Sequence, residues 1–335
     1  MKILALLAFM ALSISALGKE CIFTRAAFDV GSGTTRMKVA KVDVCKNQII
    51  KVYLKKVFPV KYKASMAQNK SKILGPEIRK KGLQTFSKLK DLAAKFRPRD
   101  YVGVATSALR QASNGGAYVA EIFNRLGIKI HIINQKKEAE IGYFGALAQG
   151  MAGYRLDDIV VWDIGGGSMQ ISSMSPSRTL TVYEGHLASI PFKNWLIKNV
   201  KHHDPSKVFT PNPLTKKQMM KGVAYTHRLA KEEVPYLLRR KARMKRSLII
   251  GIGAIHNYSV LKQFKKGTKE YNARALEQVI SALAGKTDAQ IGGEYAATDY
   301  SNLGLVLGFM QGLGIKKIQV RNVDMTDGVL INPSI

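Results

Sequence analysis

Acidic residues are scarce in this sequence. The chain of 335 residues has 23 Asp and Glu against 53 Lys and Arg, which gives a formal net charge of +30 at pH 7. Such an excess attracts polyanions over long range, whether nucleic acid, an acidic membrane or cell-wall surface, or polyphosphate. General lysine enrichment of a proteome is the alternative source of this charge. The imbalance bears on partners and solubility, so the fold has to be inferred from other features.

Cysteine is almost absent, with only Cys21 and Cys45. The adjacent His202 and His203 have no Cys or Glu cluster beside them, so we expect no metal site there. The two cysteines flank a predicted hairpin, residues 22–42, at nearly equal distances from its turn. Residues so placed face each other across a β-ladder, and in an exported protein they can form a disulfide. Two free thiols are the alternative.

The sequence offers no hydrophobic run of transmembrane length at its N-terminus. Residues 3–16 are apolar but too short for a typical membrane-spanning helix. Lys2 precedes this run and small residues follow it, so residues 1–18 are predicted to be a signal peptide. Cys21 does not stand where a lipid anchor would be attached. We expect a periplasmic or secreted protein with no stable membrane anchor, and an uncleaved anchor is the alternative.

Low-complexity segments and proline-rich linkers are also missing, and 46% of the residues are hydrophobic, so the chain can form a core. Strand-like and helix-like stretches alternate, which is typical of an α/β protein. Strands are predicted at residues 22–30, 36–42, 49–60, 101–106, 128–133, 159–164, 169–174, 179–183, 248–252 and 315–320. Helices are predicted at residues 84–96, 112–126, 138–151, 273–284 and 301–312 and within 216–243, with a basic loop at 61–80.

Two matching motifs divide the chain into lobes, which we place at residues 19–150 and 151–335. Each motif is a buried strand that ends in an Asp and a Gly-rich turn. The carboxylate suits a hard divalent cation, and the turn brings backbone N–H groups close to a phosphate. The candidate metal ligands are Asp29 and Asp163. The candidate phosphate-binding residues are Gly31, Ser32, Arg36, Thr106, Arg110, Asn114, Gly165, Gly166, Gly167 and Ser168.

In their order and spacing these motifs resemble the exopolyphosphatase / guanosine pentaphosphate phosphatase family, from about residue 26 to 330. The resemblance implies two ribonuclease H-like lobes of the actin and sugar-kinase superfamily, with a phosphate and metal cleft between them. It implies that Glu138 is the general base that activates water, with Mg²⁺ or Mn²⁺ as cofactor. It also implies a closing strand and turn at residues 322–330, and a C-terminal segment that packs back on the first lobe. The helical domain of longer members is not expected.

Three residues depart from the family pattern. Lys137 replaces a usual acid, Glu140 replaces a usual Arg, and Gln170 replaces the acid seven residues beyond Asp163. The two Asp motifs also resemble those of secreted apyrases, which commonly have Gln at that place. The expected function is an exported exopolyphosphatase acting on inorganic polyphosphate. The alternatives are an apyrase-like nucleoside di- or triphosphatase and a non-catalytic polyanion binder, with a homodimer possible and no specific nucleic-acid partner.

Overall fold

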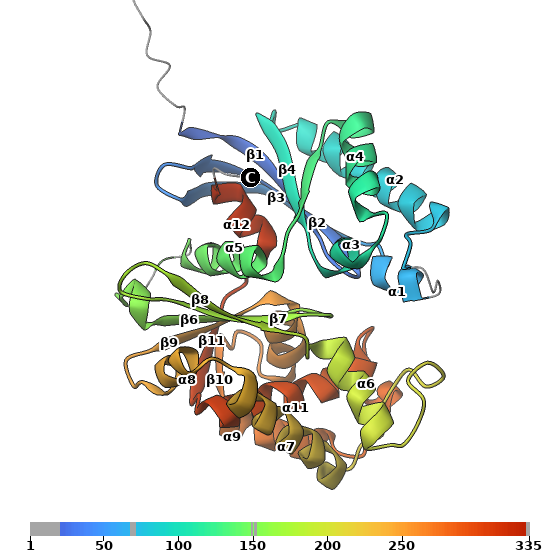
Figure 1. Ribbon diagram of the computed structural model, residues 1–335, viewed down its shortest axis with the longest axis vertical. Coiled ribbons are helices and arrows are strands. Elements are labelled where there is room, and N and C mark those ends of the chain that lie inside the picture. The colour runs from blue at the N-terminus through green and yellow to red at the C-terminus, as the bar shows by residue number, and fades with distance from the viewer. Residues whose placement is uncertain (1–20, 68–71, 149, 151–152, 333–335) are drawn as a thin grey trace, which may run out of the picture.

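Two mixed β-sheets, one in each half of the chain, form the framework of the protein (Figure 1). The computed structural model describes residues 21–67, 72–148, 150 and 153–332. The predicted signal peptide lies outside these residues. Within the described ranges, every helix is too short or too polar to cross a membrane. The predicted α/β class with two lobes is confirmed.

The first lobe has a five-stranded sheet in the order β3-β2-β1-β4-β5. β1 pairs antiparallel with β2 and parallel with β4, which gives the ribonuclease H-like arrangement of three antiparallel strands followed by parallel ones. Phe28 of β1 and Phe86 of α2 pack in the core on the helical face. The strands are β1 (Ile22–Val30), β2 (Thr34–Asp43), β3 (Gln48–Pro59), β4 (Asp100–Ala105) and β5 (Lys129–Ile132). The helices are α1 (Tyr62–Ala67), α2 (Pro76–Ala94), α3 (Ser107–Gln111), α4 (Gly115–Leu126) and α5 (Gln135–Leu147).

The second lobe repeats this plan in a six-stranded sheet, β10-β11-β9-β6-β7-β8. β6 pairs antiparallel with β7 and parallel with β9, as β1 does with β2 and β4. Trp162 of β6 and Phe309 of the buried helix α11 pack together in its largest core. The strands are β6 (Ile159–Ile164), β7 (Met169–Met174), β8 (Leu180–Gly185), β9 (Leu248–Ile252), β10 (Glu270–Asn272) and β11 (Lys317–Val320). The helices are α6 (Ser189–Asn199), α7 (Lys216–Glu233), α8 (Tyr236–Arg243), α9 (Ala273–Leu283), α10 (Asp288–Ile291), α11 (Ala296–Leu313) and α12 (Met325–Ile331).

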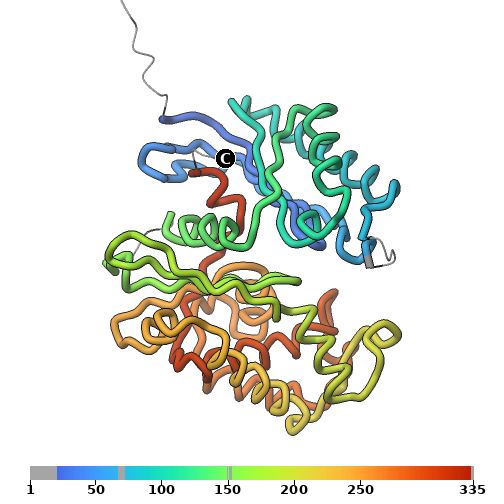
Figure 2. The backbone as a smooth tube through the Cα atoms, viewed as in Figure 1, coloured from blue at the N-terminus to red at the C-terminus, as the bar shows by residue number. Residues whose placement is uncertain are grey.

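Helices α5 and α12 lie between the two sheets (Figure 1). Ile141 of α5 joins a core cluster of the first lobe, whereas Tyr143 and Ala146 join a cluster of the second. The chain then returns from the second lobe, so that α12 packs against β1 and β2 of the first, as the red end of the tube shows (Figure 2). α5 therefore presents its first turn, with Glu138, at the boundary between the lobes.

The first strand is tied to the C-terminal helix by Arg25. Its guanidinium donates to the carbonyl groups of Val329, Leu330 and Asn332 at 2.8–3.3 Å, and pairs with both carboxylate oxygens of Asp100. These acceptors include carbonyl groups that the end of a helix leaves without intrahelical partners. Arg25 thus closes the first lobe around α12.

The prediction of a closing strand and turn at residues 322–330 is wrong, because residues 325–331 form helix α12. Asp324 caps the helix through the backbone N–H of Thr326, and Asp327 accepts from the backbone N–H of Asp324. This reciprocal arrangement is a capping box, which satisfies N–H groups that a helix start would otherwise leave unpaired. The local capping residues and the core contacts together favour a helix there.

Two further predictions need correction. The helix predicted at residues 112–126 begins only at Gly115, as α4, and a short helix that was not predicted, α3, precedes it. The turn between them is fixed because the Asn114 amide bonds both backbone groups of Leu74. The loop predicted at residues 61–80 contains α1 and the start of α2, with Pro76 at the first turn of α2.

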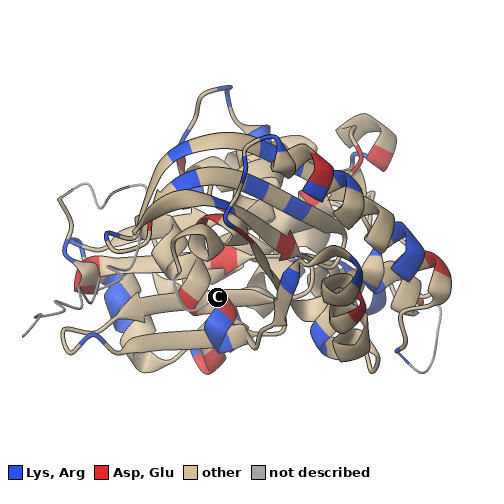
Figure 3. Ribbon diagram, turned by 90° about the horizontal axis from the view of Figure 1, so that it is seen from above, with Lys and Arg blue, Asp and Glu red and all other residues tan. Residues whose placement is uncertain are grey.

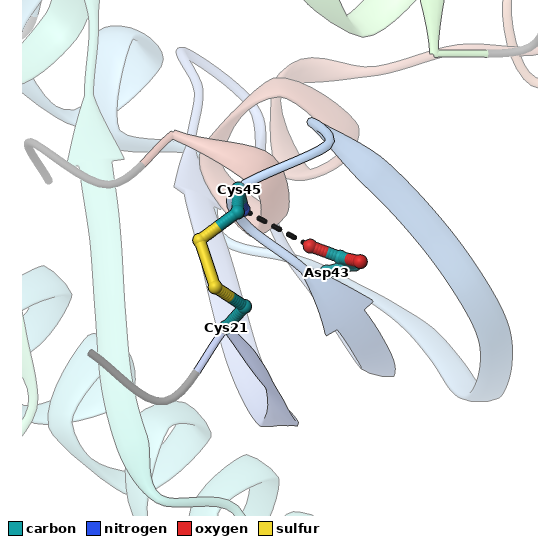
Figure 4. Close-up of side chains that lie close together, drawn as sticks. All are labelled: Cys21, Asp43 and Cys45. Atoms are coloured by element: carbon teal, nitrogen blue, oxygen red, sulfur yellow. Dashed lines mark hydrogen bonds between the residues drawn. A yellow bond between two sulfur atoms is a disulfide. The ribbon is translucent and has the colours of Figure 1, made fainter. Parts of the chain in front are cut away.

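A disulfide joins Cys21 and Cys45 beside the β1–β2 ladder (Figure 4). The register pairs Ile22 with Asp43, so the two cysteines lie just beyond the last pair of the hairpin. The Asp43 carboxylate accepts from the backbone N–H of Cys45 at 3.1 Å, which fixes the turn that follows β2. The pairing left open by the sequence is therefore formed.

Candidate active site

The first carboxylate of the site is Asp29, the next-to-last residue of β1. Arg36 of β2 is its register partner, and the Arg36 Nη1 to Asp29 Oδ2 distance is 3.0 Å. Burial raises the pKa of Asp29, while the charge of Arg36 opposes this effect and Asp324 adds to it. The β1–β2 hairpin thus delivers an acid and a cation together to one edge of the sheet.

The second carboxylate, Asp163, occupies the corresponding place at the end of β6. Gly253 follows β9 with φ +84°, and a Cβ there would lie 2.2 Å from Asp163 Oδ1. A glycine is required at this turn both for its backbone conformation and for the close approach of the carboxylate. Burial and the charges of Glu138 and Asp29 raise the pKa of Asp163 to about 7. Asp163 is therefore held close to the other acids.

Glu138, the predicted base, lies in the first turn of α5 and is 7% exposed. Arg110 Nη1 contacts Glu138 Oε2 at 3.1 Å and the carbonyl oxygen of Ile133 at 2.7 Å. The Ser168 hydroxyl also hydrogen-bonds the Glu138 carboxylate. Burial still raises the pKa of Glu138 to about 7, since it outweighs the opposing charge of Arg110. A carboxyl group with this pKa can take up a proton near neutral pH.

The Gly-rich turns of the two lobes face each other. A Cβ on Gly167 would lie 3.3 Å from both Ser107 Oγ and Lys63 Nζ, and 3.7 Å from Ser32 Oγ. A side chain at Gly167 would crowd these three groups. Two hydroxyls and an ammonium group therefore surround a space between the lobes, and such donors suit phosphoryl oxygens.

The same backbone arrangement supports both turns. In the first lobe the carbonyl of Ser32 accepts from Lys63 N–H, and the turn closes from Gly31 N–H to Thr34. In the second lobe the carbonyl groups of Gly165 and Gly166 accept from the first residues of α6, and the turn closes from Gly165 N–H to the Ser168 carbonyl. Each turn is thus fixed against the start of a helix.

Thr106 and Asn114, both predicted to bind phosphate, lie in different surroundings. Thr106 follows β4 and bonds the carbonyl of Val30 through its backbone N–H at 3.1 Å, so it lies beside the first turn. Asn114 does not point at the site, because its amide donates to and accepts from Leu74. Its role as a phosphate ligand is replaced by a structural one, holding the loop between α3 and α4.

Two of the departures from the family pattern neutralise each other. Lys137 Nζ lies 2.8 Å from Glu140 Oε1 on the partly exposed surface of α5. The third, Gln170, is the register partner of Asp163 across β6 and β7, and it is 2% exposed. Directly opposed residues share a face of the sheet. The Gln170 Nε2 is buried and has no hydrogen-bond partner among the described residues.

The donor set of the site fits a hard divalent cation. Asp29 raises the pKa of Glu138, and Asp29 and Glu138 both raise the pKa of Asp163, so a positive charge among them would relieve a repulsion that the arginines only partly offset. Within the described residues, the ligand atoms of these acids do not all lie within 4.8 Å of one another. These three carboxylates alone therefore do not form a closed set of metal ligands.

Two residues of the site were missed by the sequence reasoning. Lys63 lies in a segment interpreted as a basic loop, and burial together with the charge of Arg110 lowers its pKa. Asp324 contacts Lys38 at 3.7 Å and Lys55 at 3.3 Å, and it acts electrostatically on Asp29 and Arg36. For Lys63 the sequence offers only its position after the third predicted strand as an indication of a site residue. For Asp324 it offers the pattern of a helix cap.

Comparison with known proteins agrees with this geometry. The sequence model of the Ppx/GppA phosphatase family matches residues 42–200. The structure superimposes on the Aquifex aeolicus PPX-GPPA enzyme with a TM-score of 0.71, covering 92% of this chain and 99% of that one at 15% identity. An exopolyphosphatase from Cytophaga hutchinsonii gives a TM-score of 0.67 at 15% identity, covering 92% and 96% of the two chains. The resemblance to the Ppx/GppA phosphatase family is confirmed.

The chain is also similar in sequence to part of a longer curated protein. The bifunctional 3-dehydroquinate synthase/phosphatase of Fusobacterium nucleatum subsp. nucleatum is 28% identical over 154 residues, which are 45% of this chain. This chain spans only 23% of that protein's length.

Proposed function

We propose that the protein hydrolyses terminal phosphoanhydride bonds of inorganic polyphosphate. The observation that carries the proposal is the meeting of Asp29, Arg110, Glu138 and Asp163 at the boundary of the lobes, where Gly167 faces Lys63. Phosphoryl transfer needs mainly positioning and neutralisation of charge, and these groups supply both. The names of the Ppx/GppA relatives support the same class of reaction.

In the proposed reaction Glu138 accepts a proton from the attacking water. The water oxygen forms a bond to the terminal phosphorus while the bond to the bridging oxygen breaks, and its electron pair leaves with the shortened chain. Arg36, Arg110 and Lys63 would neutralise the phosphoryl oxygens, because guanidinium and ammonium groups make short charge-assisted hydrogen bonds. Ser168 would keep the Glu138 carboxylate oriented.

Asp29 and Asp163 would hold a divalent cation, Mg²⁺ or Mn²⁺, which when bound supplies further neutralisation of phosphoryl charge. Both carboxylates project from strand ends on opposite sides of the boundary. Their raised pKa values support this assignment, since a cation stabilises the ionised forms.

Nucleoside di- or triphosphates are the second candidate substrates. Gln170 favours them, because a neutral amide stands beside Asp163 as it commonly does in apyrases. The overall charge favours the longer polyanion, since Lys and Arg are distributed over helices and strands of the chain (Figure 3). A non-catalytic polyanion binder would have the basic surface without turnover.

We further propose that the protein is exported. The signal-peptide pattern at residues 1–18 and the Cys21–Cys45 disulfide both support this location, because disulfides persist in oxidising compartments.

The test is phosphate release by the protein of residues 19–335, with long-chain polyphosphate and ATP compared side by side in Mg²⁺. Glu138→Gln is the catalytic variant, and Glu140→Gln on the same helix is its matched control. We expect the protein to release phosphate from polyphosphate. Glu138→Gln should reduce this release at least about a hundredfold, since general-base catalysis contributes about 10²–10⁴-fold, and Glu140→Gln should retain it. Faster release from ATP would assign the protein to nucleotides. Absence of release from both substrates would overturn the proposed hydrolysis.

A further inference from the structure

A basic cavity lies in the second lobe, away from the acids of the candidate active site. It has a volume of about 310 Å³ and is formed by the loop between α8 and β9, the end of α11 and the starts of β10 and β11. The parallel register places Leu248 beside Ile159 and Ile252 beside Asp163. The cavity therefore lies about 13 Å along the strands from Asp163, at the opposite ends of the strands.

Four cationic side chains line this cavity, against the single acid Glu270. They are Arg243, Lys245, Lys316 and Lys317. Lys317 Nζ pairs with Glu270 Oε2 at 3.0 Å, whereas Lys245 and Lys316 have no ion pair among the described residues. Three positive charges thus remain after the acid is counted, and closely spaced like charges favour a polyvalent anion.

Arg243 is held in place on the wall of the cavity. Its Nε and Nη2 donate to the carbonyl groups of Leu313 and Gly312 at 3.3 Å, at the C-terminal end of α11. Gly314 ends this helix with φ +69°, and a Cβ there would lie 2.9 Å from Arg243 Cγ. The guanidinium is therefore positioned by the helix end before any ligand arrives, which reduces the entropy lost on binding.

A serine with a buried hydroxyl and a tyrosine complete the wall of the cavity. Ser247 lines the cavity, and its Oγ is buried without a hydrogen-bond partner among the described residues. Buried polar groups in folded proteins are nearly always hydrogen-bonded, so an acceptor or a water is expected beside it. The half-exposed ring of Tyr154 also lines the cavity and offers a flat face next to the cations.

We propose that this cavity binds a short oligophosphate group, as a second site separate from the acids of the lobe boundary. The ligand is either inorganic tripolyphosphate or the triphosphate group of a nucleotide, because both present several oxygen anions in a row. Lys245, Lys316 and Arg243 bind the oxygens. The proposal does not depend on hydrolysis at Glu138.

The test measures binding of tripolyphosphate by titration calorimetry to Glu138→Gln protein without divalent cations, so that no turnover occurs. The variant pair Lys245→Ala and Lys316→Ala, made in that protein, is expected to lose one bound equivalent. The control pair Lys265→Ala and Lys266→Ala removes the same charge from an exposed loop and is expected to keep that equivalent. Circular dichroism verifies that both double variants are folded.

Each outcome of the titration bears on the proposal. An unchanged number of equivalents in the Lys245/Lys316 variant would overturn it, as would an equal loss in both variants, which would indicate diffuse attraction to a basic surface. A parallel titration with ATP separates the two ligand sources: binding of ATP at least tenfold tighter than tripolyphosphate, lost in Tyr154→Ala, assigns the cavity to nucleotides. Equal affinity assigns it to the inorganic chain. Phosphate release measured separately keeps a failure of hydrolysis distinct from a failure of this site.

Discussion

Three carboxyl groups share a poorly hydrated space at the lobe boundary, and their mutual repulsion sets the properties of the site. Asp29 has Arg36 and Glu138 has Arg110 as direct ion-pair partners at 3.0 and 3.1 Å. Asp163 has no ion pair among the described side chains, and the charges of Asp29 and Glu138 both raise its pKa. The site is therefore close to a change of protonation at neutral pH.

The pH dependence of hydrolysis follows from these values. Because the pKa of Glu138 is raised to about 7, the base is protonated and inactive below this pH, and it becomes ionised above it. We expect kcat/KM for polyphosphate to rise between pH 6 and 8 with a midpoint near 7 at low Mg²⁺. Higher Mg²⁺ should lower the midpoint, since a cation favours the ionised carboxylates. A rising limb near the ordinary pKa of Glu would show that burial does not control the base.

We also predict that Lys63 contributes to binding of polyphosphate. Its Nζ donates to Gln111 Oε1 at 3.2 Å and lies beside Gly167, so it can reach a phosphoryl oxygen between the lobes. Lys63→Met should raise KM for polyphosphate about tenfold, because a charge-assisted hydrogen bond contributes about 1.5–3 kcal/mol. The neighbouring exposed Lys61→Met is the control and should leave KM within about twofold. Equal effects of the two substitutions would indicate a role for overall charge alone.

Elements bounded by strong local signals could be predicted from the sequence, and those fixed by distant contacts could not. β1, β6 and β7 match their predictions at both ends, because apolar runs stop at Gly and Ser turns. The Asp motifs follow from the same signals, since they stand at strand ends. α1 was missed because its helical form depends on packing against the first lobe. α12 was missed although Asp324 and Asp327 form a local capping box at its start. Lys63 is placed by a backbone bond to Ser32, which no local pattern encodes.

The β1–β2 hairpin should lose stability when its disulfide is removed. Cys21 and Cys45 are 24 residues apart, and closing a loop of this size stabilises a protein by about 3 kcal/mol. We expect Cys21→Ser with Cys45→Ser to lower the free energy of unfolding in urea by this amount. Reducing agent should lower the stability of the parent protein similarly and leave the double variant unchanged. Sensitivity of the double variant to reductant would refute the assignment of this effect to the disulfide.

The link between β1 and α12 should also be measurable. Arg25 is 4% exposed and bonds Asp100 together with three carbonyl groups at the end of α12. Arg25→Met removes these bonds and leaves acceptors unpaired, so we expect a loss of about 2–3 kcal/mol of unfolding free energy. Lys41→Met, at an exposed position of β2, is the matched control. Similar midpoints for the two variants would mean that α12 is held by its apolar contacts alone.

The whole molecule carries far more positive than negative charge, 53 Lys and Arg against 23 Asp and Glu. A long polyanion that contacts many Lys and Arg releases bound counterions, so its affinity falls steeply as salt rises. A nucleotide contacts fewer of these residues.

We therefore expect KM for long-chain polyphosphate to rise more steeply with NaCl between about 50 and 200 mM than KM for ATP. Tripolyphosphate serves as a length control and should give a slope close to that of ATP. Parallel slopes for the long and short chains would show that only the terminal phosphates contact the protein.

Helix α12 has a consequence for the order in which the protein can be completed during synthesis. Met325, Val329 and Leu330 belong to a core cluster of the first lobe, yet they follow the whole second lobe in the chain. A ribosome therefore finishes the second lobe before it releases the residues that complete the first. Until α12 emerges, the first lobe has part of one sheet face uncovered, with Ala27 and Val104 among the apolar residues that α12 later joins. Such transiently exposed apolar surface is prone to aggregate, so the nascent chain is vulnerable during this interval.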